Sequence, residues 1–352
     1  MALLQDTEVK DRIVLVRTDY NVPMRDGLIR GDYKLRASLK SIDYLLQHGA
    51  KKIILISHLG RPGGQRVPEL SLRPIAQRLT RLLGRKVYFV PMVTGDAVAV
   101  AVERLPEQGI ILLENLRFDY GEEALDPAFI EELLDDTRAD LFVQDGFAVL
   151  HRKASSVSLL PKMVEACVGL LVQKEVENLA KIMTAPKHPF VVLVGGAKVK
   201  DKAPIIKSFK NSADKILVGG KIAADGYAAS DKIVVAQDFL KDETGTKLDI
   251  GQGSIETFKK VLGQAKMVFW NGCLGKVEDE AYSRATRAIA VFLGRLEQAE
   301  VVIGGGDTVA FVEKLMQDIP SLDYEWLSTG GGASLELLAG KKLPGLVALG
   351  YD

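Results

Sequence analysis

Short apolar runs rich in Val, Ile and Leu recur along the chain, and longer segments with helical periodicity separate them. The runs of the first half occupy residues 14–16, 53–56, 87–90, 110–113 and 141–143. Those of the second half occupy residues 190–194, 216–218, 233–236, 267–270 and 301–303. Continuous apolar runs are typical of strands buried in a parallel sheet, and the helical segments supply the crossover connections. The pattern predicts an α/β protein with mainly parallel sheets covered by helices.

One helical segment divides the two halves. Residues 170–185 have the hydrophobic spacing of a helix, and Pro186 and Pro189 then end the pattern. We therefore expect an N-terminal domain over residues 1–169, an interdomain helix, and a C-terminal domain over residues 186–335. A length of 352 residues is ample for two domains of ordinary size.

The overall composition argues against several classes of function. Forty-six basic residues balance 46 acidic ones, so the sequence gives no global electrostatic reason to bind nucleic acid or a membrane surface. Two cysteines and four histidines form no zinc-binding spacing. The N-terminal segment is charged where a signal peptide needs an apolar core, and no apolar run approaches the ~18 residues of a membrane span. We expect a cytoplasmic protein with no nucleic-acid or membrane partner.

Polar and basic side chains follow the apolar runs of the first half. In an open α/β sheet, ligands bind beyond the carboxyl ends of the strands, so these positions are the candidates for function. Arginine and histidine beside a few polar residues suit a small molecule that carries phosphate or carboxylate groups. The residues at these positions are Asp19, Asn21, His58, Arg61, Arg117, Asp145, His151 and Arg152.

Glycines occupy the corresponding positions of the second half. They let main-chain N–H groups and helix N-termini approach phosphates, and the carboxylate of Asp307 beside them is suited to a divalent cation. The second half therefore has the features of a nucleotide-binding domain. The glycine turns are Gly195–Gly196, Gly219–Gly220, Asn271–Gly272, Gly304–Asp307 and Gly330–Gly332.

Each of these features has a simpler explanation when taken alone. A Gly-Gly pair after a strand is commonly only a tight turn. An isolated Arg61 or Arg117 is more typical of a surface salt bridge, and His151 of a buried, hydrogen-bonded histidine. The joint placement of five glycine turns in one half and several cations in the other favours the functional interpretation.

The first glycine turn leads into the lysine-rich stretch "LVGGAKVKDK" at residues 193–202. Pro204 favours the first turn of a helix, so we expect a helix to start near Lys202 or Ala203. Asp201 then serves as its cap, and Lys198 lies in the preceding loop. A solvated run of charges remains the alternative. The stretch lacks the spacing and the Ser/Thr of a Walker loop, and the chain has no intact GxGxxG after a strand and no GxSxG elbow.

Taken together, the motifs resemble those of phosphoglycerate kinase, in the order of that family. They are "VLVRTDYNVP", "SHLGRP", "LLENLRF", "HR" at 151–152, "VGGAKVKDK", "WNG", "GGGDT" and "STGGGASLELLAGKKLPGLVAL". The resemblance implies two Rossmann-like, three-layer αβα domains joined by a hinge helix, with the tail at about residues 336–352 packing back on the N-terminal domain. It also implies a monomer that, with Mg²⁺, reversibly transfers the acyl phosphate of 1,3-bisphosphoglycerate to ADP, giving 3-phosphoglycerate and ATP, by closure of the domains.

The resemblance further implies roles for residues of both halves. The implied phosphoglycerate ligands are Asp19, Asn21, Lys34, His58, Arg61, Arg117 and Arg152. The implied catalytic positions are Lys198, which follows the transferred phosphoryl group, and Lys34, Arg36, Gly331 and Gly332. The implied nucleotide positions are Gly196, Ala197, Lys202, Gly219, Gly220, Asn271, Glu278, Gly305, Gly306, Asp307 and Thr308, with Asp307 also on the metal side.

Several positions depart from the family pattern. Lys34 replaces the arginine that serves the transition state in the family, and lysine keeps the charge but loses the planar fork. Around the nucleotide, Lys221, Cys273 and Lys276–Val277 replace a glycine, a proline and an apolar pair. After "GGKIAADG" the chain omits a helical segment that the family carries. Two functions stay open: a working kinase of shortened form, which we favour, and a relative with weak or lost turnover that binds ligands or a protein partner.

Overall fold

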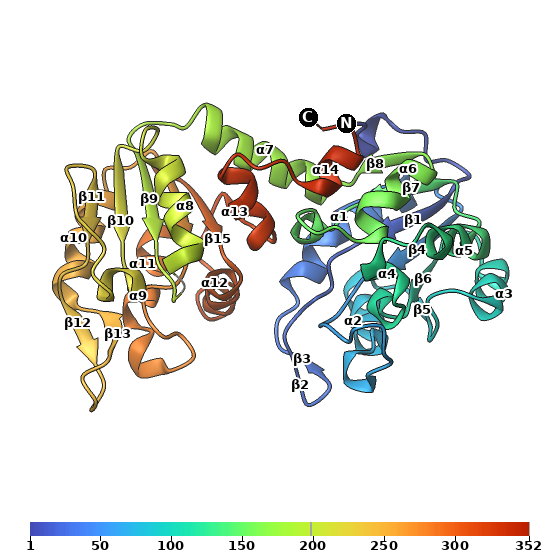
Figure 1. The fold of residues 1–352 in the computed structure, drawn as a ribbon, viewed down its shortest axis with the longest axis horizontal. Helices are drawn as coiled ribbons and strands as arrows, with labels where there is room; N and C mark the ends of the chain where they lie inside the picture. Colours follow the sequence, from blue (N-terminus) through green and yellow to red (C-terminus); the bar gives the residue numbers. More distant parts are fainter. Residues whose placement is uncertain (198, 352) are drawn as a thin grey trace. The chain divides into compact units, whose positions relative to one another are not determined.

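The structure is a computed structural model that describes residues 1–197 and 199–351, without the side chains of residues 199–201. The described chain forms two compact units (Figure 1). One comprises Met1–Val176 with the C-terminal segment from Lys342, and the other comprises Glu177–Lys341. The division falls inside helix α7, Leu170–Thr184. The domain boundaries expected from the sequence stay a prediction.

A six-stranded parallel sheet forms the centre of the first unit, with strand order β5-β6-β4-β1-β7-β8. Its strands are β1 (Ile13–Arg17), β4 (Lys52–Ile56), β5 (Val87–Val90), β6 (Gly109–Leu113), β7 (Leu141–Gln144) and β8 (Ala166–Val168). Val14 and Val16 pack into one apolar core and Leu15 into another, because successive side chains of a strand point to opposite faces. Both faces of the sheet are therefore buried, which explains the continuous apolar runs.

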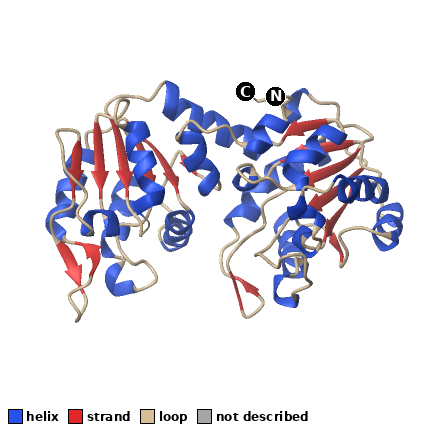
Figure 2. Cartoon of the chain, in the orientation of Figure 1, coloured by secondary structure: helices blue, strands red, loops and turns tan. Residues whose placement is uncertain are grey.

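Helices cover this sheet (Figure 2). They are α1 (Tyr33–Gln47), α2 (Arg73–Leu83), α3 (Asp96–Arg104), α4 (Gly121–Ala124), α5 (Pro127–Thr137), α6 (Leu160–Met163) and α14 (Pro344–Ala348). Single turns η1 (Leu4–Asp6), η2 (Pro68–Leu70), η3 (Leu116–Phe118), η4 (Phe147–Val149) and η5 (Ser155–Leu159) and the hairpin of β2 (Met24–Arg25) and β3 (Leu28–Ile29) complete the unit. The Gly345 N–H donates to the Leu150 carbonyl oxygen at 2.9 Å, so α14 is bonded to this unit.

The second unit contains another six-stranded parallel sheet, with strand order β11-β10-β9-β14-β15-β16. Its strands are β9 (Phe190–Val194), β10 (Lys215–Val218), β11 (Ile233–Val235), β14 (Met267–Asn271), β15 (Glu300–Gly304) and β16 (Trp326–Leu327). Counted along the chain, the order outward from one edge is third, second, first, fourth, fifth, sixth, which is the Rossmann order. The ligand crevice of such a sheet lies where the order reverses, between β9 and β14.

Helices of the second unit connect these strands. They are α8 (Val199–Phe209), α9 (Gly220–Ala224), α10 (Gln252–Leu262), α11 (Arg284–Leu293), α12 (Gly306–Asp318) and α13 (Gly332–Leu338), with the turn η6 (Glu280–Tyr282) and the hairpin of β12 (Phe239–Lys241) and β13 (Lys247–Ile250). Among the residues that the structure describes, no helix is both long enough and apolar enough to cross a bilayer.

The ten apolar runs all form strands, so the predicted α/β architecture with parallel sheets is confirmed. The expected helix start near Lys202 is wrong, because α8 begins at Val199 and contains Pro204. The fixed φ of Pro204 suits a helix, and its costs at this place are one missing hydrogen bond and crowding of its ring against the carbonyl group four residues earlier.

Candidate functional site

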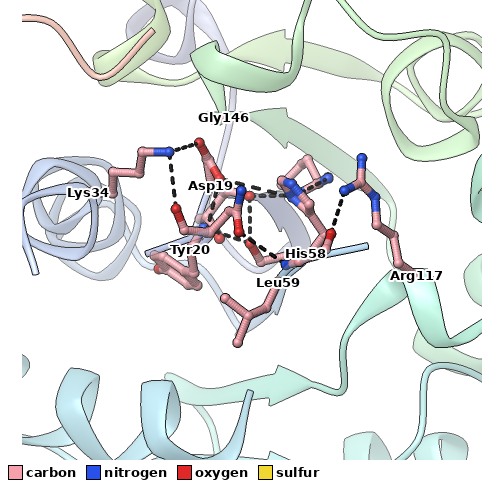
Figure 3. Close-up of polar contacts among 12 residues, drawn as sticks. Asp19, Tyr20, Lys34, His58, Leu59, Arg117 and Gly146 are labelled. Atoms are coloured by element: carbon pink, nitrogen blue, oxygen red, sulfur yellow. Dashed lines mark hydrogen bonds and ion pairs between the residues drawn. The ribbon is translucent and has the colours of Figure 1, made fainter. Parts of the chain in front are cut away.

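Loops after β1 and β4 and the first turn of α1 meet in one hydrogen-bonded network (Figure 3). Lys34 Nζ donates to Asp19 Oδ2 at 2.6 Å and to the Asn21 carbonyl oxygen at 3.2 Å. The Asn21 N–H donates to Asp19 Oδ1 at 3.0 Å, and Asn21 Oδ1 accepts from the Gly60 N–H at 3.0 Å. His58 adjoins the network, with Nδ1 4.0 Å from Asp19 Oδ1. The structure thus brings together four of the phosphoglycerate residues expected from the sequence.

Asp19 in this network is an ionised carboxylate. Its side chain is buried, and burial raises the pKa. The charge of Lys34 and the hydrogen bonds from Lys34 and the Asn21 N–H outweigh burial and hold the Asp19 pKa at about 2. Lys34 is therefore held by the loop that carries Asp19 and Asn21.

Arg117 extends the cationic surface beside the network. Its Nη1 donates to the Gly60 carbonyl oxygen at 2.6 Å, and its Nε lies 3.2 Å from Glu123 Oε1. Burial lowers the pKa of the Arg117 guanidinium, and the positive charges of Arg152 and Arg61 lower it further. Arg117 therefore forms the salt bridge expected of an isolated arginine, with Glu123 as its partner. It also lies within electrostatic range of Arg61 and Arg152. A bound phosphate or carboxylate would offset their repulsion.

Arg36 lies outside this network. Its Nε donates to Asp32 Oδ1 at 2.8 Å, and Arg78 Nε donates to the other oxygen of Asp32 at 2.8 Å. Positions two residues apart on a helix do not face each other, so α1 directs Lys34 and Arg36 to different neighbours. The structure therefore associates Lys34, but not Arg36, with the phosphoglycerate residues.

A buried pair beside this network was not predicted from the sequence. Arg17 at the end of β1 and Glu122 in α4 are 2% and 1% exposed, with Arg17 Nη2 3.7 Å from Glu122 Oε1. Arg17 Nη2 also lies 3.3 Å from His58 Nδ1. An arginine at the end of an apolar strand was the available signal, because a buried guanidinium requires partners.

Asp145, which follows β7, has a structural role in this unit. Its Oδ1 accepts from the Leu171 N–H at 3.0 Å in the first turn of α7. Burial raises the pKa of the Asp145 carboxyl to about 7, although hydrogen bonds from Ser41 and the α7 backbone oppose the shift. The carboxyl therefore caps a helix N-terminus.

In the second unit, two glycine turns meet at the point where the strand order reverses. The Gly195 N–H donates to the Asn271 carbonyl oxygen at 3.0 Å, and the Gly196 N–H donates to the Cys273 carbonyl oxygen at 2.7 Å. Gly272 has a φ of +101°, and a Cβ there would lie 2.2 Å from the Gly195 carbonyl oxygen. Because the two backbones touch, no residue with a side chain fits at Gly272.

Polar side chains surround these turns. Lys202 Nζ donates to Asn271 Oδ1, and the Gly272 N–H donates to Thr308 Oγ1 at 3.1 Å. Cys273 Sγ lies 3.6 Å from Thr308 Oγ1. Within the described part of the chain, the buried Asn271 Nδ2 has no hydrogen-bond partner. An amide donor, a cationic amine and a hydroxyl thus lie close together at the switch point.

The remaining glycine turns lie at neighbouring strand ends. Gly219 directly follows the carboxyl end of β10. Gly220 has a φ of +61° and lies close to Gly196, since an added Cβ on Gly220 would lie 2.9 Å from the Gly196 nitrogen. Gly305 precedes α12, with exposed Asp307 in its first turn. The Ser328 N–H donates to the Ile303 carbonyl oxygen at 2.8 Å, so the Gly331–Gly332 turn at the start of α13 follows the strand beside β15.

Two acidic side chains lie within electrostatic range of this crevice. Burial raises the pKa of the Cys273 thiol to about 12, and the negative charges of Asp307 and Glu278 contribute. Among residues 1–197 and 199–351, no group of three or more His, Cys, Asp or Glu gathers as a metal site. Ala197 is exposed after β9, and Lys198 lies outside the described residues.

Comparison with known proteins agrees with this geometry. The phosphoglycerate kinase family model matches residues 4–244 and 224–341. The chain is 38% identical over 392 aligned positions to phosphoglycerate kinase of Moorella thermoacetica, covering 98% of both proteins. It is 36% identical over 395 positions to phosphoglycerate kinase of Fervidobacterium nodosum, covering 98% of this chain and 97% of the relative.

Solved structures give the same result. Phosphoglycerate kinase from Pyrococcus horikoshii OT3 superimposes with a TM-score of 0.88 at 26% identity, covering 100% of this chain and 99% of that one. The structure from Coxiella burnetii superimposes with a TM-score of 0.79 at 28% identity, covering 99% and 98%. The match to the family model, the shared fold and the identity to relatives across nearly the whole length show that this chain belongs to the phosphoglycerate kinase family.

Proposed function

We propose that this chain catalyses the reversible transfer of the acyl phosphate of 1,3-bisphosphoglycerate to ADP, giving 3-phosphoglycerate and ATP. The observation that carries the proposal is the presence of two complementary half-sites. One is the cationic network of Lys34, Asp19 and Arg117 at the carboxyl ends of the first sheet. The other is the glycine cradle of Gly196 and Gly272 at the switch point of the second. Family membership supports the same reaction.

The reaction needs charge neutralisation more than proton transfer. In the ATP-forming direction an oxygen of the ADP β-phosphate attacks the acyl phosphorus, and the bond from phosphorus to the carboxyl oxygen breaks. The carboxylate that leaves, or attacks in reverse, is ionised at neutral pH, so no general base is required. Catalysis then rests on positioning and on positive groups around the migrating phosphoryl. Lys34 is the candidate from the first unit, and Lys198, outside the described residues, is the candidate from the second.

The phosphoglycerate half-site combines positive charge with fixed hydrogen-bonding groups. We assign the ligand to Asp19, Asn21, His58, Arg61, Arg117 and Arg152 together with Lys34. Burial lowers the pKa of Arg117, and the charges of Arg152 and Arg61 lower it further, so an anion that enters would offset the repulsion among the three arginines.

The nucleotide half-site consists mainly of backbone. Main-chain N–H groups at Gly305 and Gly306 suit phosphates, and Lys202 adds a cation near Asn271. Magnesium retains several waters and binds proteins through one or two carboxylates together with substrate phosphates. Exposed Asp307, in the first turn of α12, fits that donor set. The ion would neutralise phosphate charge.

We further propose that the chain works as a monomer in the cytoplasm. Both cysteines, Cys167 and Cys273, are free and buried, which fits a reducing compartment. Because the half-sites lie in different units, the reacting complex requires them to close on both substrates, and closure also keeps water from the acyl phosphate.

Trapping the product tests this function. Native protein is incubated with MgATP, 3-phosphoglycerate and hydroxylamine, which converts an acyl phosphate to a stable hydroxamate. We expect hydroxamate to accumulate with ADP, and none to form without 3-phosphoglycerate or without magnesium. ATP hydrolysis without hydroxamate, or ligand binding with neither product, would instead identify a binding protein without kinase turnover.

A further inference from the structure

A chain of buried hydrogen bonds holds Arg17 beside the phosphoglycerate network. Arg17 Nε donates to Ser156 Oγ at 2.9 Å, and Nη1 donates to the Thr18 carbonyl oxygen at 2.5 Å. Ser156 Oγ lies 2.7 Å from Glu122 Oε1, and the Ser156 N–H donates to Glu122 Oε2 at 3.0 Å. Arg17, Ser156 and Glu122 are each at most 2% exposed. Protein groups therefore occupy the Arg17 donors, Ser156 at Nε and Thr18 at Nη1, so Arg17 acts on the site through its neighbours.

The direction of each hydrogen bond in this Arg17–Ser156–Glu122 series is fixed. A guanidinium has only donors, so Ser156 Oγ accepts from Arg17 and turns its own proton toward Glu122. Glu122 accepts at both oxygens. Burial raises the pKa of the Glu122 carboxyl, while Arg17 and both bonds from Ser156 lower it. The chain thus fixes the orientation of the guanidinium, with Nη2 toward His58.

His58 faces a further donor of this guanidinium. Its Nδ1 lies 3.3 Å from Arg17 Nη2, and the ring is 2% exposed. Because Nη2 carries only protons, Nδ1 must present its lone pair, and the proton of the neutral ring then lies on Nε2.

All but one of the charged groups around the His58 ring lower its pKa. Burial lowers the pKa of His58 well below its ordinary value, and the positive charges of Arg17, Arg117 and Lys34 lower it further. The Asp19 carboxylate raises it, with Oδ1 4.0 Å from Nδ1.

We propose that Arg17 is a positioning residue, oriented by Ser156 and Glu122, that holds His58 as the neutral Nε2–H tautomer and so supplies a fixed hydrogen-bond donor to phosphoglycerate. The inference rests on the proposed function for the identity of the ligand. It adds that His58 binds as a neutral donor, so its contribution does not change across about pH 6 to 8, where an unperturbed histidine would titrate.

Nitrogen NMR of the full-length protein tests the tautomer directly. The ring nitrogens are labelled, and the signals of His58 are identified by their loss in His58→Gln. We expect an unprotonated Nδ1 and a protonated Nε2 that stay unchanged across about pH 6 to 8. A proton on Nδ1, or titration of the ring near its ordinary pKa, overturns the proposal.

Arg17→Lys tests the positioning role. One ammonium cannot hold Ser156, Thr18 and His58 together, so we expect mixed or titrating His58 signals and a rise of about tenfold in KM for 3-phosphoglycerate, with a smaller change in kcat. Arg12→Lys makes the same change at a partly exposed arginine held by Asp140 and Glu165, and should leave both readouts as in the native protein. Native signals and KM in Arg17→Lys contradict the proposal.

Ser156→Ala is the second variant, used if Arg17→Lys does not fold. It removes the hydroxyl relay and leaves every charge in place, and it should alter the His58 signals in the same way. The NMR readout needs no turnover. A native protein with the expected tautomer but no kinase activity therefore defeats only the proposed function, whereas an active protein with the other tautomer defeats only this inference.

Discussion

Lys34 is one of the positions at which the sequence motifs depart from the family pattern. The sequence implied that lysine replaces an arginine that serves the transition state. The structure holds its ammonium 2.6 Å from Asp19 Oδ2, within the phosphoglycerate network. The lysine ammonium is a compact group already bonded to the Asp19 carboxylate. The planar guanidinium of an arginine could bond to Asp19 with one edge and donate to the migrating phosphoryl group with another.

We therefore expect Lys34→Arg to raise kcat by about tenfold, because the fork adds a charge-assisted hydrogen bond in the transition state. Steady-state kinetics in both directions measure the effect. Arg36→Lys is the matched control, since Arg36 bonds to Asp32 and should leave kcat as in the native protein. An unchanged kcat in Lys34→Arg together with a fall in Arg36→Lys would assign the role to Arg36 instead.

The residues of the site were only partly predictable. Asp19, His58 and Arg117 could be named because each follows a recognisable apolar run, and the carboxyl ends of parallel strands share one edge of a sheet. Arg17 was missed because its partners Glu122 and Ser156 lie more than a hundred residues away, and only tertiary structure brings a buried guanidinium to them.

At the scale of elements, the glycine turns of the second unit depend on close backbone contact. Gly220 adopts a φ of +61°, and an added Cβ would lie 2.9 Å from both the Gly196 nitrogen and the Cys273 carbonyl oxygen. We expect Gly220→Ala to weaken binding of the magnesium nucleotide by tenfold or more, because about 1–3 kcal/mol of overpacking strain falls on the cradle itself. Binding of 3-phosphoglycerate should not change.

Calorimetric titration with each ligand separates these effects. Gly245→Ala is the control, since Gly245 in the β12–β13 hairpin also has a positive φ, of +83°, but a Cβ there meets nothing within 4 Å. It carries the same kind of backbone strain without the clash. Native nucleotide affinity in Gly220→Ala would show that the turn is only structural.

The cap of helix α7 makes stability depend on pH. The Asp145 carboxyl has a pKa of about 7 in the folded protein, above its ordinary 3.8, so the folded state keeps a proton that the unfolded chain has lost. Its contribution to stability is fully present below about pH 4 and is lost as pH rises through about 7. Asp145→Asn keeps an oxygen for the Leu171 N–H and cannot titrate.

We therefore expect the free energy of unfolding of Asp145→Asn to fall less between about pH 5 and 8 than that of the native protein, and to equal or exceed it at the upper end. Urea unfolding at several pH values measures this. Asp126→Asn changes an exposed cap of helix α5 and should keep the native slope. Parallel curves for Asp145→Asn and the native protein would contradict the assignment.

Secondary structure was predictable where burial dominates. Val14, Leu15 and Val16 are buried from both faces of one sheet, and such runs are unambiguous. The edge strands β8 and β16 were not predicted, because two or three residues at a sheet edge carry no periodicity. The predicted start of α8 is wrong because Pro204 lies farther inside the helix than the first turn that proline favours.

At the scale of the whole molecule, the chain is a shortened member of its family. The two matches to the family model overlap over residues 224–244, which include the connection from α9 to β11, where the sequence omits a segment. A loop is more tolerant of such a loss than a core, and each unit has a six-stranded parallel sheet. We therefore expect any difference in turnover between this chain and its relatives to come from particular residues, Lys34 foremost, and not from a loss of the fold.

The most direct test of the account is ATP consumption with 3-phosphoglycerate, coupled to removal of the acyl phosphate, in native protein, Lys198→Ala and Lys34→Ala. We predict that native protein turns over and that Lys198→Ala lowers kcat by about 10² or more, as the loss of one oxyanion donor does. Lys34→Ala should also lower kcat and should weaken 3-phosphoglycerate binding. A native protein that binds both ligands yet turns over no faster than either variant would contradict the proposed phosphoryl transfer.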